Sequence, residues 1–379
     1  MRLLLLTIDF PPAAGGVQQQ VSKLADGLAS AHEISVVTRR QAGNRAWDAG
    51  CRYHIRRALA TPSARVNLVL MALCALAEIA YRPPDLIICG HVLFGPLCRL
   101  IRAVLRIPYV AMAYVYEIRA PRMRRIAGWA LRGADAVVTN SEFTRQAVLA
   151  HGVVPERVVV ILPGPGLTVA TKNQLAAERR IEVDGKILLS VSRLVDRYKG
   201  HDMVLRALPL IRAKVPEAHY VIVGHGWLKP YLERLASSLG VHNAVTFVGE
   251  ADDDEVLAWY ERCDLFIMAS RESAASGGAE GYGIVFIEAN LHGKPAIGGR
   301  SGGIPDAVLD GVTGLLVNPL DVGEIADAVV RLMNDPALAS RLGAAGRRRA
   351  LVDLSWPKYV ERFDEVLRAA ICPSSLTRA

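Results

Sequence analysis

The chain has 379 residues, of which 51% are hydrophobic, and its formal net charge is +8. That length exceeds what one hydrophobic core usually organises, and the apolar content is enough for two cores, so we expect two domains. Residues 1–180 hold 23 basic and 11 acidic side chains, against 22 and 26 in the rest of the chain, and because no nucleic-acid-binding module accompanies this basic excess, we expect no nucleic-acid partner.

The first half of the chain alternates apolar runs with helical patterns. Residues 2–8 form a continuous apolar strand, and after a Pro- and Gly-containing loop, apolar residues between positions 17 and 28 recur at helical spacing. Further buried strands are expected at residues 34–38, 85–89, 108–113 and 136–139. Apolar strands separated by helices are typical of a parallel sheet that is covered on both faces, so we expect a doubly wound α/β domain.

Two groups of arginines carry the basic excess. The first contains Arg39, Arg40, Arg45, Arg52, Arg56 and Arg57, and the second contains Arg119, Arg122, Arg124, Arg125 and Arg132. The second group alternates with apolar residues such as Trp129, which is typical of a helix on an anionic membrane surface, although a solvated basic face is the alternative. The apolar run at residues 66–81 is short for a membrane span and is interrupted by Asn67 and Glu78, so we expect a buried helix there and no transmembrane segment.

A cluster of prolines and glycines at residues 162–166 interrupts the chain, and a polar run without a clear period follows at residues 171–180. We place the domain boundary there, between residues 1–165 and 166–356. Strands resume at residues 186–191, 218–223, 245–248, 265–268 and 295–297, with helices between them. Two Rossmann-like domains would bind a ligand at the carboxyl ends of their strands.

One stretch combines groups that suit a sugar joined to a phosphate. Glu280 and Glu288 bracket a Gly-x-Gly turn that opens an apolar segment, residues 284–291, which is long enough for a short helix. Backbone N–H groups at a helix N-terminus face an anion, while carboxylates accept hydrogen bonds from sugar hydroxyls. Upstream, Arg193 and Lys199 supply cations for a diphosphate. The sequence therefore predicts a nucleotide-sugar pocket.

The acidic residues 252–255 could in principle bind a metal, but they directly precede the apolar pattern of a helix. We therefore expect an N-cap and an acidic first turn there. The histidines are scattered and form no ligand set, so we expect no metal and no cofactor. The six cysteines are also scattered, without Cys-x-x-Cys spacing, which indicates reduced thiols and a cytoplasmic protein.

Five segments occur in an order that resembles a known enzyme group. They are Asp9 to Val17, Ser192-Arg193-Leu194 with Lys199-Gly200, Ile222 to Gly226, Glu280 to Glu288, and Ser301 to Asp306. Through these segments the chain resembles GT-B glycosyltransferases of the retaining group 1 (family four) type, which includes bacterial phosphatidylinositol mannosyltransferases. The five segments are spread over nearly the whole chain. The resemblance implies two Rossmann-like domains facing across a cleft. Residues 1–165 would be the acceptor-side domain, with a C-terminal helix at about 357–379 packed back on it, and residues 166–356 would bind the nucleotide sugar.

The resemblance also implies roles at the donor. Arg193 and Lys199 would bind the diphosphate and stabilise the leaving group, because negative charge grows on the leaving oxygen as the glycosidic bond breaks. Glu280 would hold hydroxyls of the hexose, and Glu288 those of the ribose. The remaining donor contacts would come from Gly15, Gly16, His225, Gly283, Ile284 and Val285.

The chain departs from the group at one position. Tyr114 stands after a strand where the group usually carries a histidine that touches the donor sugar. A tyrosine hydroxyl donates a hydrogen bond but is not cationic near neutral pH. We assign Tyr114 to the catalytic set, and Tyr116 and Glu117 to acceptor contacts, with packing roles as the alternative for these last two.

Together with these residues, the resemblance implies a retaining, metal-independent hexosyltransferase. Mannose from GDP-mannose is the first choice of donor, and the acceptor would be lipid-linked or a cell-envelope glycan. The protein would be cytoplasmic and peripheral at the inner face of the cell membrane. The alternatives are a UDP-sugar-dependent transferase acting on a soluble natural product or sugar phosphate, and a GT-B nucleotide-sugar epimerase. A dehydrogenase is disfavoured because no Gly-x-Gly-x-x-Gly follows the first strand.

Overall fold

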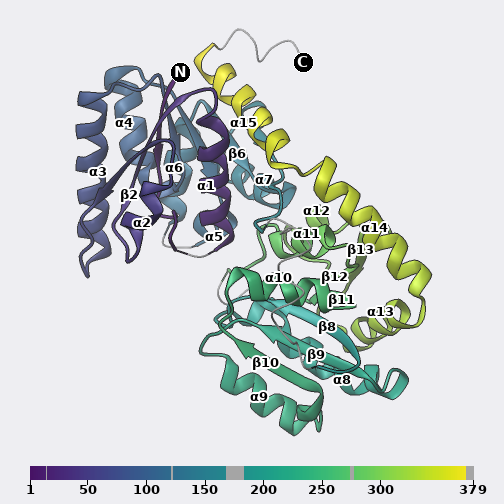
Figure 1. Ribbon diagram of the computed structural model, residues 1–379. Helices are drawn as coiled ribbons and strands as arrows, with labels where there is room; N and C mark the ends of the chain where they lie inside the picture. Colours follow the sequence, from purple (N-terminus) through teal and green to yellow (C-terminus); the bar gives the residue numbers. More distant parts are fainter. Residues whose placement is uncertain (14, 121–122, 168–182, 274–276, 373–379) are drawn as a thin grey trace. The chain divides into compact units, whose positions relative to one another are not determined.

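A computed structural model describes residues 1–13, 15–120, 123–167, 183–273 and 277–372. The chain divides into two compact units, one of Met1–Pro163 with Trp356–Ala379 and the other of Gly164–Ser355 (Figure 1). Each unit contains one parallel sheet with helices packed on it, so the expected α/β class with two Rossmann-like domains is confirmed. Arg122, the polar run at residues 171–180 and residues 373–379 lie outside the described residues.

The first unit is built on a seven-stranded sheet with the order β3-β2-β1-β4-β5-β6-β7. Its strands are β1 (Arg2–Leu6), β2 (Glu33–Arg39), β3 (His54–Ala58), β4 (Leu86–Cys89), β5 (Tyr109–Ala113), β6 (Ala136–Thr139) and β7 (Val158–Val160). Leu3 of β1 pairs with Ile34 of β2 on one side and with Leu86 of β4 on the other. The strand order reverses between β1 and β4, which is where doubly wound sheets usually bind ligands.

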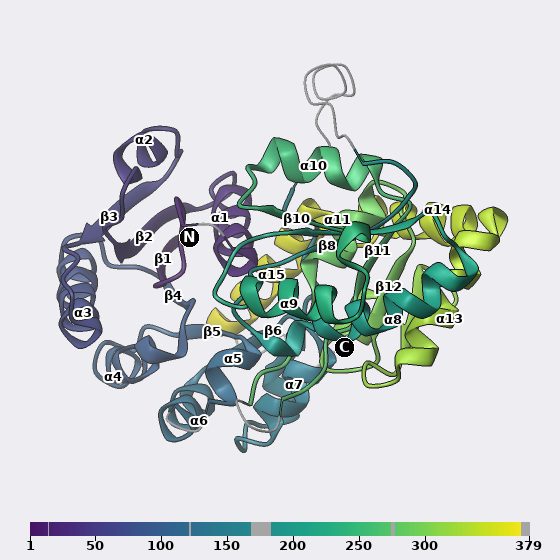
Figure 2. The same cartoon turned by 90° about the horizontal axis from the view of Figure 1, so that it is seen from below.

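Long helices cover both faces of this sheet. On one face lie α1 (Gly16–Leu28) and α15 (Trp356–Ile371), and on the other lie α3 (Ala64–Tyr81), α4 (Gly95–Leu105), α6 (Arg124–Gly133) and α7 (Glu142–Leu149). Figure 2 shows α3, α4 and α6 following one another along the same side of the unit. Two short helices, α2 (Asn44–Ala49) and α5 (Val115–Ile118), complete the described helices of this unit. The close packing of α15 on α1 depends on Gly27, because a Cβ there would lie 2.3 Å from Cγ2 of Val360.

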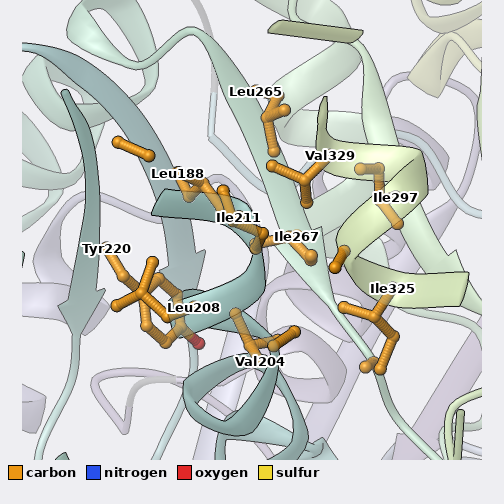
Figure 3. Close-up of a cluster of buried hydrophobic side chains, with 14 of the residues drawn as sticks. Leu188, Val204, Leu208, Ile211, Tyr220, Leu265, Ile267, Ile297, Ile325 and Val329 are labelled. Atoms are coloured by element: carbon orange, nitrogen blue, oxygen red, sulfur yellow. The ribbon is translucent and has the colours of Figure 1, made fainter. Parts of the chain in front are cut away.

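The second unit has a six-stranded sheet with the order β10-β9-β8-β11-β12-β13. Its strands are β8 (Lys186–Val191), β9 (Ala218–Val223), β10 (Val245–Gly249), β11 (Leu265–Met268), β12 (Ala296–Gly299) and β13 (Gly314–Val317). Its helices are α8 (His201–Lys214), α9 (Lys229–Ser238), α10 (Asp253–Arg262), α11 (Ile284–Leu291), α12 (Ile304–Ala307), α13 (Val322–Asn334) and α14 (Pro336–Val352). Figure 3 shows apolar side chains of α8 and α13 packed against this sheet in a fully buried core.

Two expectations about local structure are settled by these helices. Asp252 is the N-cap of α10, since its Oδ1 accepts a hydrogen bond from Glu255 N at 2.9 Å, so the expected cap is confirmed. The expectation of a buried helix at residues 66–81 was wrong. The helix forms, as α3, but only Met71, Ala75, Glu78 and Ile79 are buried. Apolar composition predicted the helix, while its burial depended on neighbours that cover only one of its faces.

Candidate active site

An ion pair lies at the carboxyl end of the second sheet. After β8 the chain turns through a short 3₁₀ helix, Arg197–Lys199, and the Lys199 ammonium reaches Oε2 of Glu280 at 2.6 Å. Both side chains are mostly buried, with 17% and 14% exposed. Burial alone lowers the pKa of Lys199, but the charge of Glu280 and its hydrogen bond outweigh burial, and the net effect is a raised pKa. The structure therefore brings together, as an ion pair, two of the four side chains expected at the donor.

The loop that carries Glu280 is held by the backbone of the next strand end. Gly303 N donates to Glu280 O at 2.8 Å, and Gly302 adopts a φ of 60°. A Cβ at Gly302 would lie 2.5 Å from Glu280 O. This close approach requires glycine, so residues 301–303, which follow β12, position the carboxylate that meets Lys199.

The N-terminus of α11 lies just beyond this loop. Gly283 is its N-cap and has a φ of 94°, and a Cβ there would lie 2.6 Å from the Phe286 ring. Ile284 and Val285 are half-buried, whereas Phe286 and the following residues of the helix are buried. Because the first N–H groups of a helix have no partner inside it, this end offers donors and a partial positive charge to an anion.

Glu288 lies on the same helix, 5% exposed, and is already hydrogen-bonded. Its Oε1 accepts from Leu167 N at 3.2 Å, and its Oε2 accepts from the Tyr260 hydroxyl at 2.9 Å. Burial raises the pKa of Glu288, against the opposing effect of these hydrogen bonds. Tyr260 was not among the expected site residues, because in α10 it follows the same apolar spacing as the core residues around it.

The other expected residues of this unit lie on two loops that contact each other. Leu194 N donates to His225 O at 2.8 Å, which joins the loop after β8 to the loop after β9. The Arg193 and His225 side chains are exposed. Burial raises the pKa of the Tyr198 hydroxyl, and the charges of Lys199, Glu280 and Arg193 also affect that pKa. Arg193 therefore belongs to the same charged neighbourhood as the ion pair.

A second polar cluster lies in the first unit, at the reversal of strand order. Asp9 follows β1, and it accepts hydrogen bonds from the Tyr116 hydroxyl at 2.8 Å and from Gln18 Nε2 at 2.9 Å. Gln18 belongs to the first turn of α1, which begins at Gly16 with Gly15 as its N-cap. The two glycines expected at the donor thus lie on the loop that Asp9 opens.

Residues after β4 and β5 complete this cluster. Glu117 is 2% exposed, and its Oε2 accepts from Val92 N at 2.8 Å and lies 3.7 Å from His91 Nδ1. Leu93 N donates to the same His91 nitrogen at 3.2 Å, so the ring proton of the neutral imidazole is on Nε2. Burial raises the pKa of Glu117 to about 8 and lowers that of His91 to about 4, so both side chains are mostly neutral at pH 7.

Ligand atoms of Asp9, His91 and Glu117 lie within 4.8 Å of one another, which is close enough to consider a metal. Hydrogen bonds from Gln18, Tyr116 and Val92 N already engage both oxygens of Asp9 and one of Glu117. Neither Asp9 nor His91 was among the expected site residues. The available signal was their position directly after two neighbouring strands of a doubly wound sheet.

Tyr114 differs from its neighbours in being buried. Its side chain is 3% exposed, its ring stacks on that of Tyr116 at 6.2 Å, and its hydroxyl has no hydrogen-bond partner within the described part of the chain. Burial raises the pKa of Tyr114 well above its usual value, so the hydroxyl stays protonated. A role at the donor sugar stays a prediction for this residue.

Comparison with known proteins places this chain in a family. A family described as "Glycosyl transferases group 1" matches residues 171–349, and a "Glycosyl transferase 4-like domain" matches residues 15–164. The chain is 35% identical to a GDP-mannose-dependent alpha-(1-6)-phosphatidylinositol monomannoside mannosyltransferase of Mycolicibacterium smegmatis, over 96% of this chain and 98% of the relative.

Solved structures are similar in fold. Sucrose-phosphate synthase from Thermosynechococcus elongatus has a TM-score of 0.80 at 23% identity and covers 97% of this chain and 98% of its own. HepE from Anabaena, in complex with UDP and glucose, has a TM-score of 0.78 at 20% identity and covers 97% and 100%. Because the sequence relative matches over nearly the full length of both chains, this protein belongs to the group 1 glycosyltransferases with the GT-B fold.

Proposed function

We propose that this glycosyltransferase moves mannose from GDP-mannose to a hydroxyl of a phosphatidylinositol-mannoside type of lipid acceptor, with retention at the anomeric carbon and without a metal. The observation that carries the proposal is the mostly buried Lys199–Glu280 pair, whose ammonium and carboxylate lie 2.6 Å apart. The donor and acceptor classes rest on the printed activity of the Mycolicibacterium smegmatis relative.

The donor diphosphate binds to Lys199, Arg193 and the N–H groups at the start of α11, Gly283 to Val285. In this reaction the acceptor oxygen attacks the anomeric carbon and the bond from that carbon to the diphosphate breaks. GDP leaves with the bonding electrons, and a donor phosphate oxygen takes the acceptor proton. The growing negative charge on the leaving group is met by the Lys199 ammonium, the Arg193 guanidinium and a helix dipole, so no metal cation is required.

The two glutamates bind the hydroxyls at the ends of the donor. Glu280 accepts from hexose hydroxyls, and its pairing with Lys199 sets the distance between the sugar-binding and phosphate-binding groups. Glu288 accepts from the ribose. Its two existing donors, Leu167 N and the Tyr260 hydroxyl, orient the carboxylate and leave further lone pairs for a ligand. His225 borders the nucleotide.

On the acceptor side we assign contacts to Tyr116 and to Asp9, whose hydroxyl and carboxylate suit a polyol. Glu117 acts through its hydrogen bond to Val92 N, which ties the loop after β4 to the segment after β5. Gly15 and Gly16, at the start of α1, are assigned to donor contacts. The enzyme works in the cytoplasm, as a peripheral protein at the inner face of the membrane where a lipid acceptor is available.

The test is a transfer assay with radiolabelled GDP-mannose, UDP-glucose or UDP-N-acetylglucosamine as donor and phosphatidylinositol, its monomannoside or a soluble sugar phosphate as acceptor. We expect a mannolipid product only with GDP-mannose and an inositol lipid, the same rate after treatment with EDTA, and an α-linked sugar by NMR. Turnover with a UDP-sugar alone, or inversion at the anomeric carbon, would refute the proposal.

A further inference from the structure

The outer surfaces of α3, α4 and α6 expose an unusual number of large apolar side chains. On α3, Val69 is 59% exposed and Leu73 is 57% exposed, and on α4, Val104 is 69% exposed. The complete set on these helices is Val66, Val69, Leu73, Leu76, Tyr81, Leu100, Val104, Leu105, Ile126 and Trp129. We call this surface the three-helix face. Apolar side chains gathered in this way on neighbouring helices indicate a surface that another phase or molecule covers.

The charges on the same three helices are almost all positive. Their basic residues are Arg65, Arg99, Arg102, Arg124, Arg125 and Arg132, and their only acid is Glu78. Glu78 is buried and points into the unit, where it binds Ser35 Oγ at 2.9 Å and Arg56 Nη1 at 3.1 Å. Arg102 is paired with Asp135, the residue that follows α6 by two positions. The rest of the three-helix face therefore combines apolar and cationic groups without acids.

The basic character continues beside the C-terminal end of α3. A hollow of about 670 Å³ there is lined by side chains of β3 and of the last turns of α3. Its polar lining is Arg40, His54, Arg56, Arg57, Glu78, Tyr81 and Arg82. Arg57 forms an ion pair with Asp48, and Arg56 forms one with Glu78. Arg40 and Arg82 are the remaining arginines that line the hollow. Arginines therefore line the edge of the apolar surface, where they can bind anionic groups.

The helix α3 is long and apolar enough to cross a membrane by length and composition, and among the described residues it is the one helix that meets this test. Its attachment argues against a crossing. Met71, Ala75 and Ile79 pack into the core of the first unit, and the strands before and after it, β3 and β4, belong to one sheet. A crossing would strip this face from the sheet, so α3 can only lie along the surface of a bilayer.

We propose that the three-helix face docks on an anionic lipid bilayer, with its apolar side chains at the level of the upper acyl chains and its arginines among the phosphates. This deepens the membrane location proposed above and rests on it. A second copy of the chain is the poorer occupant, because pairing two such faces brings arginines against arginines. An anionic bilayer complements both the apolar and the cationic components of the face.

The test is sedimentation of the full chain with vesicles of phosphatidylglycerol and phosphatidylcholine, against vesicles of phosphatidylcholine alone. Wild type should sediment with the anionic vesicles, less so at high salt. The double variant Arg124→Gln/Arg125→Gln should weaken binding about thirtyfold, the equivalent of about 2 kcal/mol. Val69→Ser/Leu73→Ser should weaken it at least about tenfold.

The control is Leu351→Ser/Val352→Ser on α14 of the second unit, where both side chains are about as exposed, at 53% and 52%. This variant should bind like wild type. A readout that does not depend on folding of those variants is quenching of tryptophan fluorescence by brominated lipid, which should be lost in Trp129→Phe. Equal binding to neutral vesicles, wild-type binding by the α3 variant, or quenching unchanged in Trp129→Phe would each overturn the proposal.

The assay contains no sugar donor, so the two proposals fail separately. Loss of the expected vesicle binding refutes the docking face and leaves glycosyl transfer untouched. Absent transfer by a protein that binds anionic vesicles as expected counts against the proposed function alone.

Discussion

Replacing Glu280 by alanine separates sugar recognition from nucleotide binding. In the wild type the carboxylate is 2.6 Å from the Lys199 ammonium, and both groups are largely withdrawn from water. The variant leaves this ammonium without its counter-ion, so burial should lower the pKa of Lys199. A donor diphosphate would then supply the negative charge that Glu280 provides in the wild type.

The magnitudes follow from the geometry. Removing one partner of a buried pair lowers the free energy of unfolding by about 3–5 kcal/mol. Because 17% of the Lys199 side chain and 14% of the Glu280 side chain are exposed, we expect Glu280→Ala to lower it by about 3 kcal/mol. Loss of hydrogen bonds from sugar hydroxyls to a charged acceptor costs about 1.5–3 kcal/mol each, so transfer should fall at least on the order of 10²-fold in kcat/KM. GDP binding should be tighter, since the phosphate no longer competes with Glu280 for Lys199.

The assays are calorimetric titration with GDP, thermal unfolding with and without GDP, and mannosyl transfer. GDP should raise the melting temperature of Glu280→Ala by more than it raises that of the wild type, because a ligand that binds only the folded state stabilises it. Glu280→Gln is the control that keeps hydrogen-bonding capacity without charge. Unaltered turnover in Glu280→Ala, or loss of GDP binding with turnover lost in proportion, would show that this carboxylate does not recognise the sugar.

Three further outcomes test the positions of individual groups. Tyr260→Phe removes a donor from the buried Glu288 carboxylate, so it should lower the free energy of unfolding by about 1–3 kcal/mol and weaken GDP binding, measured by denaturation and calorimetry. Burial raises the pKa of Glu117 to about 8 in the folded chain, above its usual value in the unfolded chain. The folded chain therefore keeps a proton that the unfolded chain has lost, and the free energy of unfolding should fall as pH rises from 7 to 8, by at most about 1.4 kcal/mol. Glu117→Gln should flatten that slope, and an unchanged slope would contradict the assignment. Gly302→Ala, with a φ of 60° and a Cβ 2.5 Å from Glu280 O, should reduce transfer by displacing the Glu280 loop, while Gly311→Ala, with a similar φ and no neighbouring atoms within 4 Å, should leave transfer unchanged.

Some elements of the molecule were readable from local pattern. The acidic run at residues 252–255 was recognised as a cap because an N-cap aspartate and the helix it starts are adjacent in the chain. The turn before α11 was recognised for the same reason, since Gly283 and the apolar segment after it are consecutive. The strands β3 and β13 were missed, because β3 (His54–Ala58) carries two arginines and a histidine among five residues, and β13 begins with glycine.

What the sequence determined by itself was the alternation of buried strands and helices in two sheets, together with the residue types that a nucleotide sugar requires. These follow from periodicity and from chemistry carried within a few residues. Tertiary structure decided which of those residues meet. Lys199 and Glu280 are 81 positions apart, and Asp9 and Tyr116 are 107 apart.

Tertiary structure also decided which apolar surface is left uncovered. The pattern of α3 is that of a core helix, yet only one of its faces has a neighbour. The physical reason is the same in each case, because long-range contacts depend on strand order and on the ends at which parallel strands stop, and neither is written in any single stretch of the chain.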